Sequence, residues 1–258
     1  MKNGHGVVAA AHSNPNHHPD IEKFVAKIRR RYEFTASEAL LLQDRITELA
    51  SFTPGEFLVK EGEKIGYSSL ILEGFAARCK DTRAGDRQIM ELQIPGDFVD
   101  LHSYPLEVLD HGICALGHCT IAKLYHDDIT LLIEEHPRLA RILWFSTMVD
   151  ASIHREWIMN IGSRSGAARI AHLLCELHCR YEVVGLTKGH SFPFLLNQTQ
   201  IGECLGFTQV HVNRLLRDLR ESKLVSFQDR RAEIHDWDGL CDLADFDPSY
   251  LYLDKREA

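Results

Sequence analysis

Residues 208–220 carry polar and basic side chains whose types and spacing suit reading the bases of DNA. Val212, Leu215 and Leu219 recur at helical intervals, which predicts a helix with one apolar face. The opposite face carries amide and guanidinium groups, which near a helix start can reach base edges in a major groove. With two arginines further along the chain, the candidate DNA-contacting residues are Thr208, Gln209, Val210, His211, Asn213, Arg214, Arg217, Arg230 and Arg231.

A shorter predicted helix precedes this one. Asn197 can cap its start, and Gly206 ends it. After the second helix, residues 224–227 and 232–235 alternate like the strands of a hairpin, and its tip places two arginines where they would contact phosphate. The segment therefore predicts a helix-turn-helix followed by a wing, although two helices joined by glycine also fit an ordinary helical corner.

The distribution of charge also favours nucleic acid as a partner. The 258-residue chain has a formal net charge of −8. Residues 164–235 nevertheless carry ten Lys or Arg against seven Asp or Glu, so this part is +3 and the remainder is −11. An acidic body with a mildly basic C-terminal module suits a DNA-binding regulator whose affinity depends on dimerisation.

Length and composition predict a soluble protein of two domains. The sequence has no run of eighteen apolar residues that would predict a membrane span, and its N-terminus lacks the pattern of a signal peptide. The seven scattered cysteines fit a reducing compartment, so we expect a cytoplasmic protein. Glycine-rich phosphate loops, nucleophile elbows and paired metal motifs are missing from the sequence, so we do not expect an enzyme.

The rest of the chain predicts an α+β fold. Glycines recur between short apolar runs from residue 51 onward, which is typical of a compact antiparallel β-roll. Helical spacing marks residues 21–50 before the roll and residues 137–163 after it. The predicted segments are a flexible arm (1–20), a β-roll domain with flanking helices (21–136), a long helix with a hinge (137–163), the winged helix-turn-helix (164–240) and a C-terminal tail (241–258).

The long helix carries an apolar stripe at alternating intervals of three and four residues. The members of the stripe are Leu139, Ile142, Ser146, Val149 and Ile153. Such spacing over two heptads suits a seam with another helix, and we interpret it as the dimerisation surface. Packing of the same stripe on the chain's own β-roll is the alternative.

The order of β-roll, long helix and winged helix-turn-helix resembles the Crp–Fnr family of bacterial transcription regulators over about residues 50–240. The motifs that carry the resemblance are Phe52-x-Pro54-Gly55-Glu56, Glu61-Gly62-Glu63, Leu70-Ile71-Leu72-Glu73-Gly74, Pro95-Gly96-Asp97-Phe98, and Ile201-Gly202-x₃-Gly206 with Val212-Asn213-Arg214. The resemblance implies a roll of the double-stranded β-helix or jelly-roll type, a homodimer joined through the long helix, and a near-palindromic operator in double-stranded DNA. RNA polymerase is a candidate partner of such a regulator, whereas a membrane is not.

Residue by residue, the resemblance assigns Arg214 to a guanine contact. The position where the best-known members have Glu holds Val210, whose methyl groups suit a thymine methyl and cannot accept from a cytosine amine. Gln209, His211 and Asn213 would then share the readout. We therefore expect a half-site different from the family's common one.

The effector region also departs from the family. Members that bind cyclic nucleotides hold the cyclic phosphate with an Arg-Ser pair, and the matching positions here are Leu109 and Asp110. Leucine supplies no charge and aspartate repels an anion, so cyclic AMP is not the expected effector. The roll senses another effector or none, and the candidate pocket residues are Gly96, Asp97, Phe98, Leu109 and Asp110.

Histidines and cysteines near this region support an alternative function. His111, Cys114, His118 and Cys119 lie where haem-binding relatives place an axial ligand, and they could hold haem, a metal or a redox centre. Ordinary strand residues and buried thiols are the simpler interpretation, under which no cofactor is expected. A third hypothesis is a ligand-binding or scaffold protein whose helix-turn-helix only packs.

Overall fold

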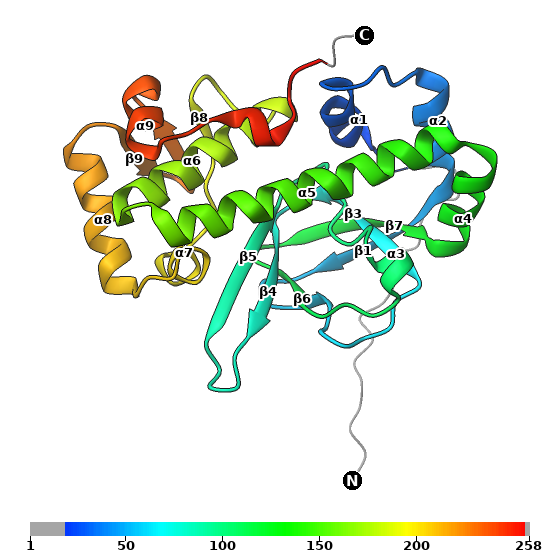
Figure 1. Ribbon diagram of the computed structural model, residues 1–258, viewed down its shortest axis with the longest axis horizontal. Helices are drawn as coiled ribbons and strands as arrows, with labels where there is room; N and C mark the ends of the chain where they lie inside the picture. Colours follow the sequence, from blue (N-terminus) through cyan, green and yellow to red (C-terminus); the bar gives the residue numbers. More distant parts are fainter. Residues whose placement is uncertain (1–18, 256–258) are drawn as a thin grey trace.

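A computed structural model describes residues 19–255 (Figure 1). The arm predicted for residues 1–20 therefore lies outside the described residues, except for its last two. Two short helices, α1 (Glu22–Arg29) and α2 (Ala36–Arg45), precede the β-roll. Thr35 and Glu38 form a reciprocal capping box at the start of α2, which explains why the second helix begins there.

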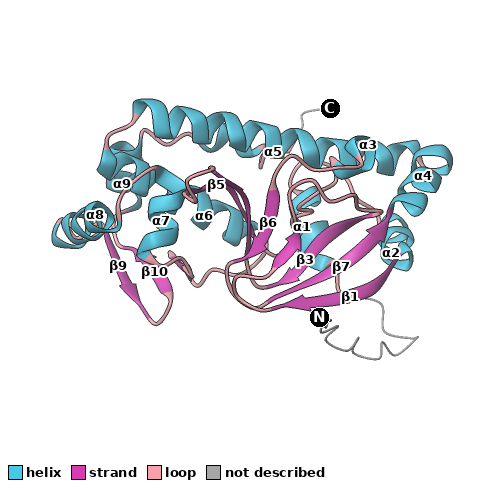
Figure 2. Cartoon of the chain, turned by 90° about the horizontal axis from the view of Figure 1, so that it is seen from below, coloured by secondary structure: helices cyan, strands magenta, loops and turns pink. Residues whose placement is uncertain are grey.

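The predicted β-roll is present and consists of two antiparallel sheets (Figure 2). One sheet has the order β1-β7-β3 and the other the order β2-β6-β4-β5. The strands are β1 (Ile46–Phe52), β2 (Phe57–Val59), β3 (Tyr67–Glu73), β4 (Ala76–Asp81), β5 (Arg87–Gln93), β6 (Gly112–Ala115) and β7 (Cys119–Tyr125). Gly74 has a φ of +89°, and a Cβ there would lie 1.9 Å from the carbonyl oxygen of His118, so only glycine fits this close approach of two turns.

The prediction of helix up to residue 50 is wrong. Residues 46–52 form β1, which pairs with β7 from Ile46 opposite Leu124 to Phe52 opposite Cys119. The β-branched Ile46 and Thr47 fit this pairing, and Ile46 is fully buried in the roll. The hydrogen bonds to β7 outweigh the helical spacing that continues from α2.

One short helix interrupts the roll between β5 and β6, and two helices after β7 connect the roll to the C-terminal module. They are α3 (Ser103–Leu106), α4 (His126–Glu135) and α5 (Pro137–Ser163), and α5 runs along the length of the molecule past both domains (Figures 1 and 2). Pro137 at the start of α5 needs no hydrogen-bond partner for its nitrogen, which explains where this helix begins.

The stripe predicted as the dimer seam faces the interior of the same chain. Leu139, Ile142, Ser146, Val149 and Ile153 are all buried in the single chain. Leu139 and Ile142 pack in a core with α1 and the roll, whereas Val149 and Ile153 pack in a core shared with the C-terminal module. The interpretation of this stripe as the dimerisation surface is therefore corrected to intramolecular packing. The reason is that α5 has two apolar sides, and the sequence pattern does not show which of them packs against the chain's own core.

The C-terminal module contains the predicted helix-turn-helix and wing. Its elements are α6 (Gly166–Val183), β8 (Ser191–Pro193), α7 (Gln198–Leu205), α8 (Gln209–Glu221), β9 (Val225–Gln228), β10 (Arg231–Ile234), α9 (Trp237–Ala244) and the 3₁₀ helix η1 (Pro248–Leu251). The wing is a three-stranded sheet in the order β8-β10-β9, so β8 adds a strand that the sequence pattern did not indicate. The predicted tail begins inside α9, and Ala244 and Leu251 are buried, so this part of the chain belongs to the folded module.

A buried cluster of charges joins the two domains. The guanidinium of Arg180 on α6 donates to Asp97 of the roll at 2.7 Å and to Glu176 at 3.0 Å. Lys27 on α1 approaches the same Asp97 to 2.6 Å. Burial opposes ionisation of Asp97, but the charges of Lys27 and Arg180 outweigh it and lower the pKa of this carboxyl to about 2.

A second buried cluster ties the roll to α5. Arg78 on β4 donates to Glu91 of β5 at 2.5 Å, to Asp150 of α5 at 2.7 Å and to the carbonyl of Val99 at 2.8 Å. Burial raises the pKa of Glu91 to about 8, against the charge of Arg78. The guanidinium therefore connects β4, β5 and α5 in the interior of the chain.

Replacing Asp97 with Asn should destabilise the protein strongly, because Arg180 and Lys27 then lose the carboxylate that neutralises them. Breaking a buried ion pair on one side costs about 3–5 kcal/mol, and urea unfolding would measure the loss. The stability that the Asp97 carboxylate contributes is present above its ordinary pKa of 3.8 and is lost as the pH falls toward 2. Between these two pH values, D97N should therefore lose less stability than the unaltered protein.

Asp81→Asn is the matched control for this variant. Asp81 also forms an ion pair, with Arg87 at 2.8 Å, but the two side chains are 46% and 28% exposed. The control should lose less than about 1 kcal/mol. Equal losses in D97N and D81N would contradict a structural role for the buried cluster.

Candidate DNA-binding surface

The turn between α7 and α8 is built by local capping. Asn197 accepts from the backbone nitrogen of Gln200 and forms a reciprocal capping box with it at the start of α7. Gly206 ends α7 with a φ of +71°, and Thr208 caps α8 by accepting from the backbone nitrogen of His211. These residues set the angle at which α8 leaves the turn.

Close packing of the turn on α7 depends on Gly202. A Cβ at this position would lie 2.3 Å from the carbonyl oxygen of Phe207, so any other residue would push the turn away from the helix. On α8 the apolar side is buried, as predicted, and comprises Val212, Leu215, Leu216 and Leu219. The two helices therefore hold a single arrangement in which the opposite side of α8 faces solvent.

Most of the predicted recognition residues lie on that solvent-facing side. Gln209, Asn213, Arg214 and Arg217 are exposed, and Val210 is 82% exposed. The apolar side of α8 is complete without Val210, so packing does not explain this exposed valine. Its exposure is consistent with the predicted contact to a thymine methyl. The five side chains form a continuous surface from the start of α8 to its middle.

Two predicted DNA contacts are directed elsewhere. The ring of His211 is half-buried and packs on Phe207, with 4.7 Å between ring centroids, and its Nε2 lies 3.2 Å from a guanidinium nitrogen of Arg214. The guanidinium of Arg231 donates to the hydroxyl and the carbonyl of Ser191 at 2.9 and 2.8 Å. His211 is therefore placed to orient Arg214, and Arg231 holds β8 on the wing.

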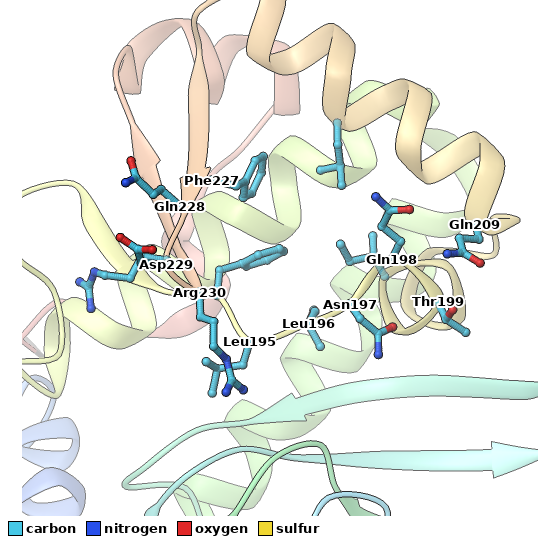
Figure 3. A pocket seen from close by; sticks show the side chains of 14 residues that line it. Leu195, Leu196, Asn197, Gln198, Thr199, Gln209, Phe227, Gln228, Asp229 and Arg230 are labelled. Carbon is cyan, nitrogen blue, oxygen red and sulfur yellow. The ribbon is translucent and has the colours of Figure 1, made fainter.

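A groove lies between the wing and the starts of α7 and α8 (Figure 3). Its volume is about 530 Å³, and its polar lining includes Asn197, Gln198, Thr199, Gln209, Gln228, Asp229, Arg230 and Arg231. The wing turns at Asp229 and Arg230, whose φ angles of +51° and +59° are unusual for residues other than glycine. The tip therefore carries one exposed arginine, Arg230, beside one aspartate.

Gln198 and Thr199 also belong to this surface, although the sequence pattern did not predict them. Both line the groove at the first turn of α7, where backbone N–H groups also lack helical partners. The available signal was the pair of polar residues directly after the Asn197 cap. Such a pair also occurs at ordinary helix starts, which is why the pattern alone did not single it out.

Four of the five predicted effector-pocket residues are packed into the fold, and the fifth, Asp110, is exposed. Leu109 is fully buried in the apolar core of the roll, and Phe98 packs on Phe24 with 5.2 Å between ring centroids. A Cβ on Gly96 would lie 2.9 Å from the backbone of α1, and Asp97 belongs to the cluster with Arg180. Asp110 is 81% exposed, and its carboxyl pKa is lowered by a hydrogen bond from His111.

The structure does not bring the four candidate haem or redox residues together. Cys114 is buried next to Cys79, whereas Cys119 is buried in the separate core inside the roll. His118 is exposed in the turn before β7, and His111 lies beside Asp110. Among residues 19–255, no group of three or more His, Cys, Asp or Glu side chains is placed to hold a metal ion.

The β-roll, the long helix and the capped helix-turn-helix with its wing define a DNA-binding transcription regulator. Two family models match the chain: a cyclic nucleotide-binding domain over residues 49–136 and a Crp-like helix-turn-helix domain over residues 168–243. The chain belongs to the Crp–Fnr family of transcription regulators. Within residues 19–255, no helix combines the length and the apolar character that crossing a membrane requires.

Relatives and solved structures agree with this assignment. The chain is 24% identical over 190 residues to the transcriptional activator protein anr of Pseudomonas aeruginosa, covering 74% of this chain and 78% of the relative. It is 27% identical over 184 residues to the transcriptional activatory protein AadR of Rhodopseudomonas palustris, covering 70% and 75%. The structure of FixK2 from Bradyrhizobium japonicum shares the fold with a TM-score of 0.69 at 21% identity, covering 76% of this chain and 96% of that one.

Arg214→Ala should reduce affinity for the protein's preferred DNA sequence by about 1–3 kcal/mol and relax the preference at one base position. The physical reason is the loss of an exposed guanidinium that His211 orients toward solvent. Arg231→Ala is the control, because its guanidinium is already engaged by Ser191, and it should leave base preference unchanged. Fluorescence anisotropy on duplexes with single-base changes measures the affinity and the base preference of both variants. An unchanged base preference in R214A would contradict the assigned readout.

Proposed function

We propose that this protein is a homodimeric, sequence-specific transcription regulator that binds a near-palindromic operator. The observation that carries the proposal is the exposed polar side of α8, which lies beside the groove under the wing. A single winged module with this modest number of cationic side chains has limited affinity, and two modules on a dimer bind successive major grooves.

The sequence preference and its salt dependence test this proposal together. Selection of bound duplexes from a random DNA pool should yield an inverted repeat, and affinity for it should fall steeply with salt because phosphate contacts release counterions. Binding that is absent or insensitive to salt would favour the alternative of a scaffold protein. A single half-site without a repeat would contradict the dimer.

The dimerisation surface that we propose is the exposed side of α5. Trp144, Met148, Ala151, Arg155, Ile158 and Gly162 follow each other at intervals of four and three residues over more than two heptads. Trp144 is 66% exposed and Ile158 is 72% exposed, which is unusual for such large apolar side chains in a monomer. This stripe is displaced by two residues from the buried one, which at about 100° per residue puts it on the opposite side of the helix.

Ile158→Glu should convert the dimer into a monomer, because the seam would then bury two unpaired carboxylates. Sedimentation velocity would show the change in mass, and operator affinity should fall because only one module can bind at a time. Leu40→Glu is the control: Leu40 on α2 is 56% exposed and lies outside the proposed seam. A dimer that persists in I158E would exclude this side of α5 as the interface.

We further propose that DNA binding does not require a cyclic nucleotide. The positions that hold the cyclic phosphate in nucleotide-binding members carry the buried Leu109 and the anionic Asp110. The guanidinium of Arg78 is buried and already bonded to Glu91, Asp150 and the carbonyl of Val99, so it is not free to bind a phosphate.

Operator affinity should therefore be the same with and without cyclic AMP or cyclic GMP at millimolar concentration. Isothermal titration calorimetry without DNA should show no heat of nucleotide binding. Leu109→Arg with Asp110→Ser introduces the residue types that nucleotide-binding members use, and it serves as the comparison. Nucleotide binding by the unaltered protein would overturn this part of the proposal.

A further inference from the structure

Two cysteine side chains face each other on adjacent strands of the roll. The Sγ atom of Cys79 on β4 donates to the Sγ atom of Cys114 on β6, and the two sulfurs are 3.6 Å apart. The strands are hydrogen-bonded neighbours, with Cys79 opposite Gly112 and Cys114 opposite Ala77. The two side chains are therefore a diagonal pair on the same face of the sheet, and a disulfide between them requires the strands to move until the sulfurs are about 2.05 Å apart.

The surroundings make Cys114 the more nucleophilic sulfur of the two. The hydrogen bond from Cys79 lowers the pKa of the Cys114 thiol, against its burial, and the charge of the nearby Arg87 acts in the same direction. Arg87 is partly exposed and forms an ion pair with Asp81 at 2.8 Å. The other close thiol pair, Cys175 and Cys241 at 4.0 Å, differs because burial raises the pKa of both groups.

The pair lies under the first helix of the helix-turn-helix. Cys79 and Cys114 belong to the same apolar core as Ile201, Cys204 and Leu205 of α7. On β5, next to the Ile89 that pairs with Cys79, the side-chain amide of Gln88 donates to the backbone carbonyls of Glu203 at 2.7 Å and Cys204 at 3.3 Å. Both thiols are almost fully buried, and residues of α7 belong to the core that surrounds them.

We infer that Cys79 and Cys114 form a redox-active dithiol, which hydroperoxides oxidise to an intramolecular disulfide and whose state changes the docking of α7 on the roll. The Cys114 thiolate attacks one peroxide oxygen, the O–O bond breaks, and a sulfenic acid forms as water or an alcohol leaves. Cys79 then attacks that sulfur, the S–S bond forms and water leaves. In total the two thiols lose two protons and two electrons, which reduce the peroxide.

The consequence for DNA follows from the position of α7. This helix supports α8 through the turn that packs on Gly202, so a movement of β4 or β6 beneath α7 is transmitted to the recognition side chains. The effect on operator binding rests on the proposed DNA-binding function, whereas the formation of the disulfide does not.

The experiment treats the reduced full-length protein with hydrogen peroxide without other oxidants. The protein should lose two of its seven free thiols, and peptide mapping should find a disulfide between Cys79 and Cys114. Cys79→Ser and Cys114→Ser should each abolish this loss. Cys119→Ser is the control, since Cys119 is buried elsewhere in the roll and its thiol pKa is raised by burial to about 12; it should still lose two thiols.

Gln88→Ala tests whether α7 controls access to the two thiols. Without its two hydrogen bonds to α7, the helix opens more often, and the two thiols should be oxidised several-fold faster than in the unaltered protein. A duplex selected by the reduced protein should bind the disulfide form at least about fivefold more weakly, and the reductant dithiothreitol should restore the affinity.

The possible outcomes are distinct. A link between Cys175 and Cys241, a link between chains, or no loss of thiols overturns the inference. A Cys79–Cys114 disulfide with unchanged operator affinity overturns its coupling to α7. If the reduced protein selects no DNA sequence, the proposed function fails, and the thiol assay still decides whether the dithiol exists.

Discussion

The buried guanidinium of Arg180 is the constraint on which the placement of the two domains depends. It bonds to Asp97 of the roll and Glu176 of α6, and Glu176 also accepts hydrogen bonds from Trp157 at 3.0 Å and Tyr250 at 2.9 Å. Charges removed from water are tolerated only where each is paired, so these groups allow very few relative positions of the sheet and the helix. Tyr250 lies near the C-terminus, so the last folded segment is held by the same cluster as the roll.

The sequence predicted the kinds and order of the elements well, because each depends on local periodicity and turn chemistry. The strands after residue 51, the helix-turn-helix and the wing all follow from apolar spacing, caps and glycines. Two failures have the same physical origin. Residues 46–50 continue a helical spacing but pair with β7, and the stripe from Leu139 to Ile153 suits either a second chain or the chain's own core. In both cases the deciding partner is distant in sequence.

The candidate site was predicted at the level of a helix face and not of individual contacts. The exposed side of α8 was correctly placed, but the pattern could not tell that His211 packs on Phe207 or that Ser191 occupies the guanidinium of Arg231. The net charge of residues 164–235 likewise does not show which of their charged side chains are exposed. Arg180 counts as a basic residue of the C-terminal module, yet it is buried and paired with two carboxylates. The electrostatic surface for DNA is therefore smaller than the composition indicates, which strengthens the need for two modules.

The interior of the roll supports the proposal that DNA binding does not require a cyclic nucleotide. A ligand that activates by binding between a β-roll and a long helix must supply contacts to both. Here Arg78 makes them within the chain, because its guanidinium bonds to Glu91 in the sheet and Asp150 on α5. The chain's own residues therefore make the contacts between the sheet and the long helix. The contact between β5 and α7 joins the roll directly to the helix-turn-helix, so a change at this junction reaches the DNA-binding helices.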